Sequence, residues 1–263
     1  MPQPGLIEQI ANLIFPPRCQ VCGELGDSPL CETCLSGVEF IAEPICGCCG
    51  APLDPLASGP PRCADCRRRR SFTAARAAGL YSGALRDAIR RYKYMGRRRL
   101  AEPLGRMLAD AVRRPDGGGL PVSDCTALIP VPLHPARRAW RGFDQARLLA
   151  DELGGALGMR VWPDALERVR NTTPQVDMRG RKRLENVRGA FEARRTYRLP
   201  GHSFILVDDV FTTGATISEC ARMLRRAGVE AVYSLTVART APGWHPASLL
   251  RAQGTDELWG DEP

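Results

Sequence analysis

The sequence has no apolar run long enough to cross a lipid bilayer, which takes about 20 consecutive apolar residues. It also has neither the basic start nor the small-residue cleavage site of a secretory signal. The partly apolar stretch at residues 6–15 instead has its apolar side chains at the spacing of an amphipathic helix. These absences predict a cytoplasmic protein without a membrane span.

Lysine is almost absent, since only Lys93 and Lys182 accompany the arginines among 37 basic residues. An arginine-biased genome explains the choice of residue, but not the net charge of +8. A moderately basic surface suits phosphorylated ligands or nucleic acid. Lys93 lies between Tyr92 and Tyr94 and is predicted to mark an exposed helix end, with contact to a ligand as the alternative.

Cysteine, by contrast, is abundant, and nine of the 11 cysteines precede residue 67. They include four CxxC hooks in two consecutive pairs, which supply enough thiolates for two tetrahedral zinc sites. The region has too few large apolar side chains for its own core, so structural Zn²⁺ would stabilise it. The predicted zinc ligands are Cys19, Cys22, Cys31, Cys34, Cys46, Cys49, Cys63 and Cys66.

The cysteine pattern of this region is also compatible with other kinds of site. A disulfide scaffold needs an oxidising compartment, and a redox CxxC normally occurs singly. The spacing leaves open whether the hooks pair sequentially or in an interleaved order, and whether Cys48 replaces a neighbour as ligand. Four arginines at residues 67–70 follow the last hook and are either a solvated linker or contacts for a nucleic-acid backbone.

Residues 204–216 carry the clearest chemistry of the sequence. Four apolar residues at 204–207 predict a strand buried in a parallel sheet, which ends at Asp208 and Asp209. The two carboxylates can accept hydrogen bonds from a sugar diol. A small loop and a helix follow, whose N–H groups suit a phosphate, and Gly214 leaves room for its approach. The predicted phosphate-binding residues are Thr212, Thr213, Gly214, Ala215 and Thr216.

Apolar runs at residues 77–81, 127–131 and 231–238 predict further strands, and helical patterns lie between them. Prolines stop the second run, three arginines follow, and the next helix opens at residues 142–145. A stiff turn supplied with guanidinium groups suits a pyrophosphate. His134 in this turn is predicted to be structural. Cys125 and Cys220 are predicted to be small core residues. The charged segment at residues 171–191 predicts a mobile loop.

Residues 207–216 resemble the phosphoribosyl-pyrophosphate signature of type I phosphoribosyltransferases. Together with the cysteine hooks and the segments at 92–94, 129–132, 141–146 and 173–175, the chain resembles the ComF family over about residues 15–240. The resemblance implies an α/β fold, with a type I phosphoribosyltransferase-like parallel sheet flanked by helices and preceded by a small double zinc-ribbon module. The expected units are an amino-terminal helix with the ribbon at 1–70, the transferase-like domain at 71–242 and a weakly ordered tail at 243–263.

The resemblance also implies roles for individual residues. Asp208 and Asp209 would be catalytic, and phosphoribosyl pyrophosphate would bind with Mg²⁺. A flexible loop would close over the sugar and exclude water. The pyrophosphate loop would contain Pro130, Val131, Pro132, Arg137 and Arg141, and the flexible loop Gln175, Arg183 and Asn186.

The implied function is phosphoribosyl transfer associated with DNA uptake in natural transformation. The alternative is a non-catalytic adaptor that binds a nucleotide or single-stranded DNA, with Tyr92 and Tyr94 exposed for stacking and DNA-uptake or recombination proteins as partners. A purely structural adaptor would not need so complete a phosphate loop. Nothing in the sequence identifies the acceptor base.

Overall fold

The computed structural model describes residues 16–54, 56, 62–67, 70–113, 119–171, 186–194 and 197–241 of the 263-residue chain. The predicted helix at 6–15, most of the predicted flexible loop and the tail lie outside these residues. Within the described part, no helix is long and apolar enough to cross a membrane.

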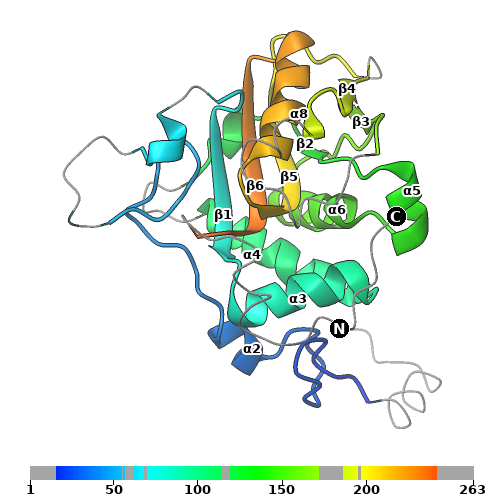
Figure 1. Cartoon of the computed structure of the whole chain (residues 1–263). Helices are drawn as coiled ribbons and strands as arrows, with labels where there is room; N and C mark the ends of the chain where they lie inside the picture. Colours follow the sequence, from blue (N-terminus) through cyan, green and yellow to red (C-terminus); the bar gives the residue numbers. More distant parts are fainter. Residues whose placement is uncertain are drawn as a thin grey trace.

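A four-stranded parallel sheet in the order β1-β6-β5-β2 forms the centre of the molecule (Figure 1). Most residues of its strands are apolar, as expected where helices cover both faces. The expected α/β architecture is therefore confirmed. The strands are β1 (Ala74–Leu80), β2 (Ala127–Pro130), β5 (Ser203–Phe211) and β6 (Ala231–Arg239).

The central strand β5 is longer than predicted. The sequence suggested that it ends at the acid pair, but it pairs with β6 as far as Phe211 and Arg239. The prediction was wrong because apolar runs mark only the part of a strand that is covered on both faces. The partner strand β6 supplies the hydrogen bonds that carry β5 through its polar end. Asp208 and Asp209 therefore lie within the strand and point to opposite faces of the sheet.

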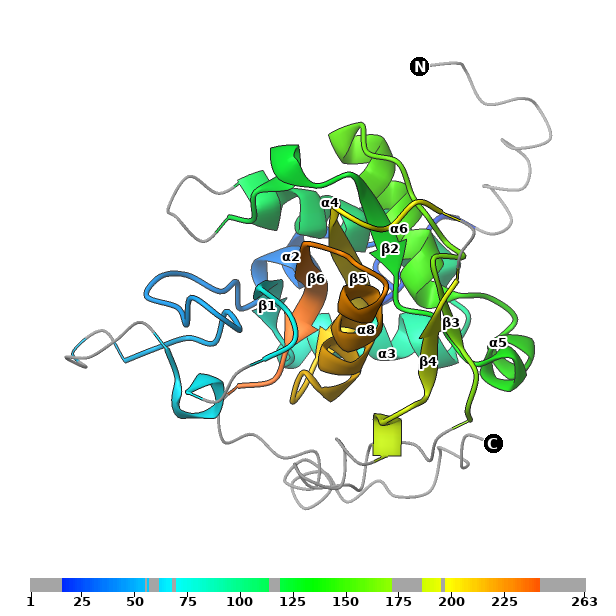
Figure 2. The same ribbon diagram turned by 90° about the horizontal axis from the view of Figure 1, so that it is seen from above.

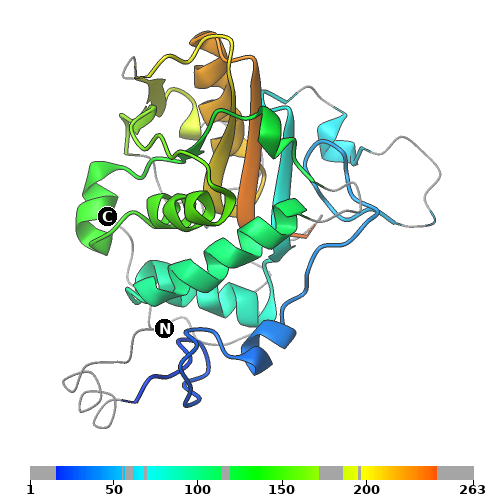
Figure 3. The same ribbon diagram turned by 180° about the vertical axis from the view of Figure 1, so that it is seen from behind.

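Three helices cover one face of the sheet (Figure 3). They pack Leu85, Leu104 and Leu149 against Ile205 and Val207 of β5. The helices are α3 (Gly83–Tyr94), α4 (Ala101–Arg113) and α6 (Gln145–Leu157).

The opposite face is covered by α8 (Ala215–Arg226) and by the antiparallel hairpin of β3 (Leu166–Arg168) and β4 (Phe191–Ala193) (Figure 2). Phe191 is buried here against Phe204 and Leu206. Part of the segment predicted to be a mobile loop, its end at Phe191, is therefore core.

The cysteine-rich region covers the β1 edge of the sheet and part of α3. Phe40 bridges Gly79 in antiparallel fashion, and the N–H of Ala75 donates to the carbonyl of Cys48 at 2.7 Å. The first pair of hooks, which includes the short helix α2 (Glu32–Ser36), packs Leu30 into the same core as Leu85. This cover removes the open edge that an exposed β1 would present.

Candidate functional site

The site lies at the carboxyl edge of the sheet, between β5 and β2. The connection after β5 runs through α8 on one face, whereas the connection after β2 runs through α6 on the other. Adjacent strands whose connections leave on opposite faces open a crevice, which is where α/β proteins bind ligands. Pro130 pairs with Val207, and the N–H of Val131 donates to the carbonyl of Val207 at 2.9 Å. The structure thus brings the prolyl turn beside the acid pair.

Asp209 points toward α3 and forms an ion pair with Lys93. The Lys93 Nζ lies 2.7 Å from Asp209 Oδ1, and only 5% of the Asp209 side chain and 18% of the Lys93 side chain are exposed. Burial opposes the charge on Lys93, but the nearby Asp209 carboxylate outweighs it and raises the pKa of the amine above its ordinary value. The prediction that Lys93 marks an exposed helix end is wrong, because the end of α3 packs against the strand.

The second carboxylate oxygen of Asp209, Oδ2, is buried and has no hydrogen-bond partner among the described residues. A buried acceptor of this kind is costly unless another group satisfies it. The Asp209 carboxylate therefore has one oxygen held by Lys93 and one buried oxygen that can accept a further bond.

Asp208 points toward α8 and carries a perturbed carboxyl group. Burial, followed by the negative charge of Asp209, raises the pKa of Asp208 to about 7, although Lys93 acts in the opposite direction. Its Oδ1 accepts a hydrogen bond from the N–H of Asp209 at 2.9 Å. A carboxyl group that titrates near neutrality in a crevice is typical of functional sites.

The loop at residues 212–216 joins the acid pair to the N-terminus of α8. Gly214 is the N-cap residue, adopts the left-handed conformation with φ of 73°, and caps the helix without a side chain. The first N–H groups of a helix have no partner within it, so this end can bind an anion. A Cβ on Gly214 would lie 2.5 Å from the Phe211 ring. Backbone conformation and packing on Phe211 thus require this glycine, independently of any anion.

Arg70, which is distant in sequence, holds this loop against the cysteine-rich region. Its Nη1 donates to the carbonyl of Thr213 at 3.2 Å, and its Nη2 donates to the carbonyl of Asp65. The last arginine of the run at residues 67–70 therefore links the second cysteine cluster to the loop predicted to bind phosphate. Neither sequence interpretation, solvated linker or nucleic-acid contact, included this role.

The predicted pyrophosphate loop differs from expectation in one respect. The turn is short, and its arginines lie on a helix, α5 (Pro135–Arg141), that the sequence analysis missed. Pro135 at the first turn suits helix initiation, and the His134 Nδ1 accepts from the N–H of Ala136 at 3.3 Å, so His134 caps the helix. Arg137 is buried, and the Arg141 guanidinium lies 5.4 Å from the centre of the Tyr94 ring.

Arg168 is a further cation at the site that the sequence did not single out. It ends β3, is buried, and lies 5.4 Å from the centre of the Phe191 ring. Its charge acts against the rise in the pKa of Asp208. Burial, then the charges of Arg168 and Arg137, lower the pKa of His134. Only the β3–β4 hairpin brings Arg168 to the site, so no local sequence pattern could have revealed Arg168 as a site residue. For Lys93, in contrast, the sequence did carry a signal, because lysine is scarce in this arginine-rich chain.

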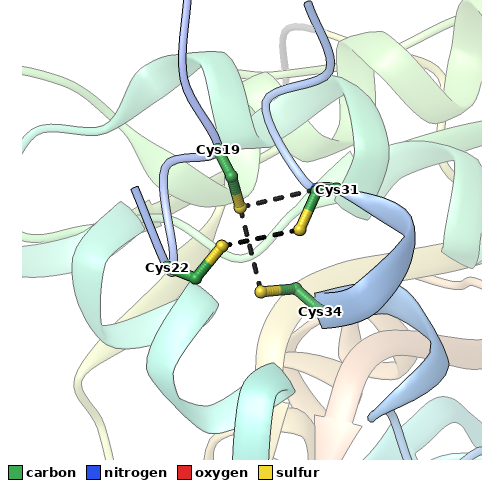
Figure 4. A group of neighbouring side chains, drawn as sticks. All are labelled: Cys19, Cys22, Cys31 and Cys34. Atoms are coloured by element: carbon green, nitrogen blue, oxygen red, sulfur yellow. Dashed lines mark hydrogen bonds between the residues drawn. The ribbon is translucent and has the colours of Figure 1, made fainter. Parts of the chain in front are cut away.

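The eight predicted zinc ligands gather in two tetrads, and within each tetrad the sulfur atoms all lie within 4.8 Å of one another. In the first tetrad, Sγ atoms lie 3.8 Å apart for Cys19 and Cys34 and 3.5 Å apart for Cys22 and Cys31 (Figure 4). A tetrahedral site with Zn–S bonds of about 2.3 Å needs sulfurs about 3.8 Å apart. The residues therefore fit structural Zn²⁺, and the hooks pair sequentially.

Cys48 is not part of the second tetrad, which contains Cys46, Cys49, Cys63 and Cys66. Its side chain is buried, and burial raises the pKa of its thiol. Cys220 is buried in the core as predicted, whereas Cys125 is only partly buried. The proposed exposure of Tyr92 is wrong, because its ring is buried and its hydroxyl donates to the carbonyl of Gln145 at 2.8 Å.

Two of the three predicted flexible-loop residues, Gln175 and Arg183, lie outside the described residues. The third, Asn186, lies near the β3–β4 hairpin, where its carbonyl accepts from Arg170 Nη2 at 2.9 Å. Its side-chain role stays a prediction.

Comparison with known proteins agrees with both parts of this architecture. A double zinc ribbon domain matches residues 10–67, and a phosphoribosyl transferase domain matches residues 141–249. Competence protein F of Haemophilus influenzae is 32% identical over 230 residues, which cover 84% of this chain and 96% of that protein.

Two further relatives extend the comparison. The DNA utilization protein YhgH of Escherichia coli K12 is 32% identical over 239 residues, which cover 87% of this chain and 99% of the relative. Competence protein ComFC of Bacillus subtilis is 27% identical over 224 residues, covering 81% and 85% of the two chains. The chain therefore belongs to the ComF family, in which a double zinc ribbon precedes a phosphoribosyltransferase domain.

Proposed function

We propose that the crevice binds phosphoribosyl pyrophosphate with Mg²⁺ and that the protein transfers its phosphoribosyl group to an acceptor. The observation that carries this proposal is the continuous path from the acid pair on β5 through the loop to the N-terminus of α8, whose N-cap residue is Gly214. In a ligand that carries a sugar diol and a phosphate a few ångströms apart, the diol would bond to the acid pair and the phosphate to the N–H groups at the start of α8. The prolyl turn beside it supplies a third position for the same ligand.

Each part of the crevice has a distinct role in this proposal. The loop residues Thr212–Thr216 would bind the 5-phosphate through backbone N–H groups and hydroxyls. Asp208 and Asp209 would hold the ribose hydroxyls and stabilise the positive charge that develops on the sugar. The turn at Pro130, Val131 and Pro132, with Arg137 and Arg141, would bind pyrophosphate. Gln175, Arg183 and Asn186 would belong to a segment that closes over the sugar.

The acid pair also fits Mg²⁺, which proteins usually bind through one or two carboxylates together with substrate phosphates. Asp209 Oδ2 is a buried carboxylate oxygen that lacks a partner among the described residues. Bound there with the ligand, the ion would neutralise charge on the pyrophosphate. Lys93 holds Asp209 in position, because its Nζ lies only 2.7 Å from the buried carboxylate.

Calorimetric titration of the zinc-loaded protein with phosphoribosyl pyrophosphate and Mg²⁺ tests this proposal. The variant with Asp208→Asn and Asp209→Asn should lose binding, whereas Asp151→Asn, an exposed acid on α6 paired with Arg147, serves as the matched control. Equal affinity in the wild type and the double variant would refute the assignment. Pyrophosphate release with candidate acceptor bases would then test turnover.

The names of the relatives add a biological setting. Two carry the name competence protein and one the name DNA utilization protein. We infer that this protein acts in the cytoplasm in the uptake or use of DNA, alongside DNA-uptake or recombination proteins. Deletion of its gene should lower transformation or growth on DNA, and restoration should require Asp208 and Asp209.

A second candidate function is binding of single-stranded DNA without catalysis. It is favoured by a groove between the first tetrad and the segment after α3, to which Arg18, Arg91, Arg97 and Arg99 contribute. Replacing Arg91, Arg97 and Arg99 by Gln should make DNA affinity less dependent on salt. The slope of log affinity against log salt concentration should become shallower by about 0.7 for each lost phosphate contact. Absence of DNA binding at low salt would exclude this function.

A further inference from the structure

Two exposed aromatic side chains lie next to each other at the end of α3 and on α5. Tyr94 is 39% exposed and Trp140 is 48% exposed, and the ring centres are 6.5 Å apart at an angle of 62°. Met95, which follows Tyr94, is 45% exposed. Among the described residues, eight large apolar side chains are exposed, and three of them occur in this one place. Figures 1 and 2 both show α5 beside the carboxyl-terminal end of α3.

Other aromatic pairs of the described structure have evident packing roles. Trp162 stacks on Tyr197 with ring centres 4.6 Å apart and planes 7° apart, and it also packs on buried Phe204. Trp140, in contrast, contacts no aromatic ring other than Tyr94 among the described residues, and nearly half of its surface is open to solvent. Packing against the described residues therefore does not account for Trp140.

One of the two rings, that of Tyr94, lies next to the lysine that holds Asp209 of the acid pair. Lys93, which holds Asp209 at 2.7 Å, immediately precedes Tyr94 in α3. The Tyr94 hydroxyl is close enough to Lys93 to contribute to the rise in the pKa of its amine. The Arg141 guanidinium, assigned above to the pyrophosphate position, lies 5.4 Å from the centre of the Tyr94 ring. Tyr94 thus contacts α5 and directly follows the lysine that holds Asp209, which places it beside the proposed ligand site.

The surroundings of the two rings are basic. Arg138 and Arg141 lie on α5, and Arg98 lies 5.0 Å from the Phe143 ring and donates to the carbonyl of Gly142. Exposed aromatic faces bordered by arginines suit a planar ring that carries a phosphate, because the ring stacks while the guanidinium groups meet the charge.

We propose that Tyr94 and Trp140 form a stacking platform for a nucleobase beside the proposed ligand site. This inference rests on the proposed function and extends it, because the platform would hold the base of the acceptor or of the product nucleotide beside the ribose site. Arg138 and Arg141 would meet the phosphate of a nucleotide. The same nucleobase chemistry is available from free bases and nucleotides or from a DNA strand.

Matched substitutions separate stacking from simple apolar contact. Trp140→Leu and Tyr94→Leu keep apolar bulk without a π face, whereas Trp140→Phe and Tyr94→Phe keep an aromatic face. Affinities for adenine, adenosine 5′-monophosphate and a hexamer of deoxyadenylate are measured by calorimetry without phosphoribosyl pyrophosphate. The leucine variants should bind about 5- to 150-fold more weakly, the range expected from loss of one base–aromatic stack. The phenylalanine variants should stay within about twofold of the wild type, since the stacking face remains.

The three ligands identify the source of the base. Weaker binding of adenine and the mononucleotide supports a small-molecule acceptor, and weaker binding of the hexamer alone assigns the platform to DNA. Unchanged affinities in the leucine variants, or no binding of any of the three ligands to the wild type, would overturn the proposal. Because phosphoribosyl pyrophosphate is absent, failure of the wild type to bind that ligand in a separate titration would count against the proposed function alone.

Discussion

Lys93→Met should destabilise the protein strongly, because it leaves the Asp209 carboxylate buried without its cation. The Asp209 side chain is only 5% exposed, and its Oδ1 lies 2.7 Å from the lysine Nζ. Breaking a buried pair by removing one partner typically costs about 3–5 kcal/mol. The size of the loss should depend on pH, since a buried carboxylate can escape its penalty by taking up a proton.

At pH 8 the uncompensated charge should cost about 3–5 kcal/mol, the range for a buried pair that has lost one partner. At pH 5.5 the loss of stability should be smaller, because a buried acid pair relieves part of this penalty when it takes up a proton. The neighbouring Asp208, whose pKa is raised by burial, shows that this environment favours proton uptake. In the wild type, Lys93 has a raised pKa, so its stabilisation is complete below the ordinary lysine value and persists through pH 8.

Urea denaturation of the zinc-loaded protein at pH 5.5 and pH 8 measures these differences. Arg106→Met is the control, because its pair with Glu102 is exposed and should change the free energy of unfolding by less than about 0.5 kcal/mol. A loss below about 1 kcal/mol at pH 8, or a loss that does not shrink at pH 5.5, would refute the reasoning on the buried pair.

Three further predictions follow from the site. Affinity for phosphoribosyl pyrophosphate with Mg²⁺ should rise about tenfold between pH 6 and pH 8 in calorimetric titrations, because Asp208 must lose a proton with a pKa of about 7; a flat profile would contradict its role. Gly214→Ala should weaken ligand binding by at least about tenfold, given the φ of 73° and the contact of the new Cβ with Phe211, whereas Gly155→Ala, in α6 with open space around it, should bind normally. Cys19→Ser should lower the zinc content by one ion per chain, and it should lower the melting temperature of the whole protein because Cys19 shares a core with Leu85. Cys48→Ser should keep both ions, and loss of zinc from this variant would contradict the assigned tetrads.

Features that depend on neighbouring residues in the chain were predictable from the sequence. Each zinc tetrad uses hooks close together in the chain, so spacing alone identified its ligands. The strand–loop–helix unit around Gly214 was also predictable, because the apolar strand, Gly214 and the helix after it are continuous in sequence. Even so, α5 was missed, since Pro135 marks the start of a helix as readily as the end of a strand.

Features that depend on contacts between distant segments were decided only by the tertiary structure. The sequence by itself determined that cysteines would be the metal ligands, where the acid pair would lie and in which order the two modules follow each other. Each of these is a pattern of residues close together in the chain. Packing of α3 across the sheet decided that Tyr92 is core, that Lys93 pairs with Asp209 and that Tyr94 stays exposed beside Trp140. Three consecutive residues at one helix end thus have three different environments, because each points in a different direction from the helix axis and meets a different distant segment.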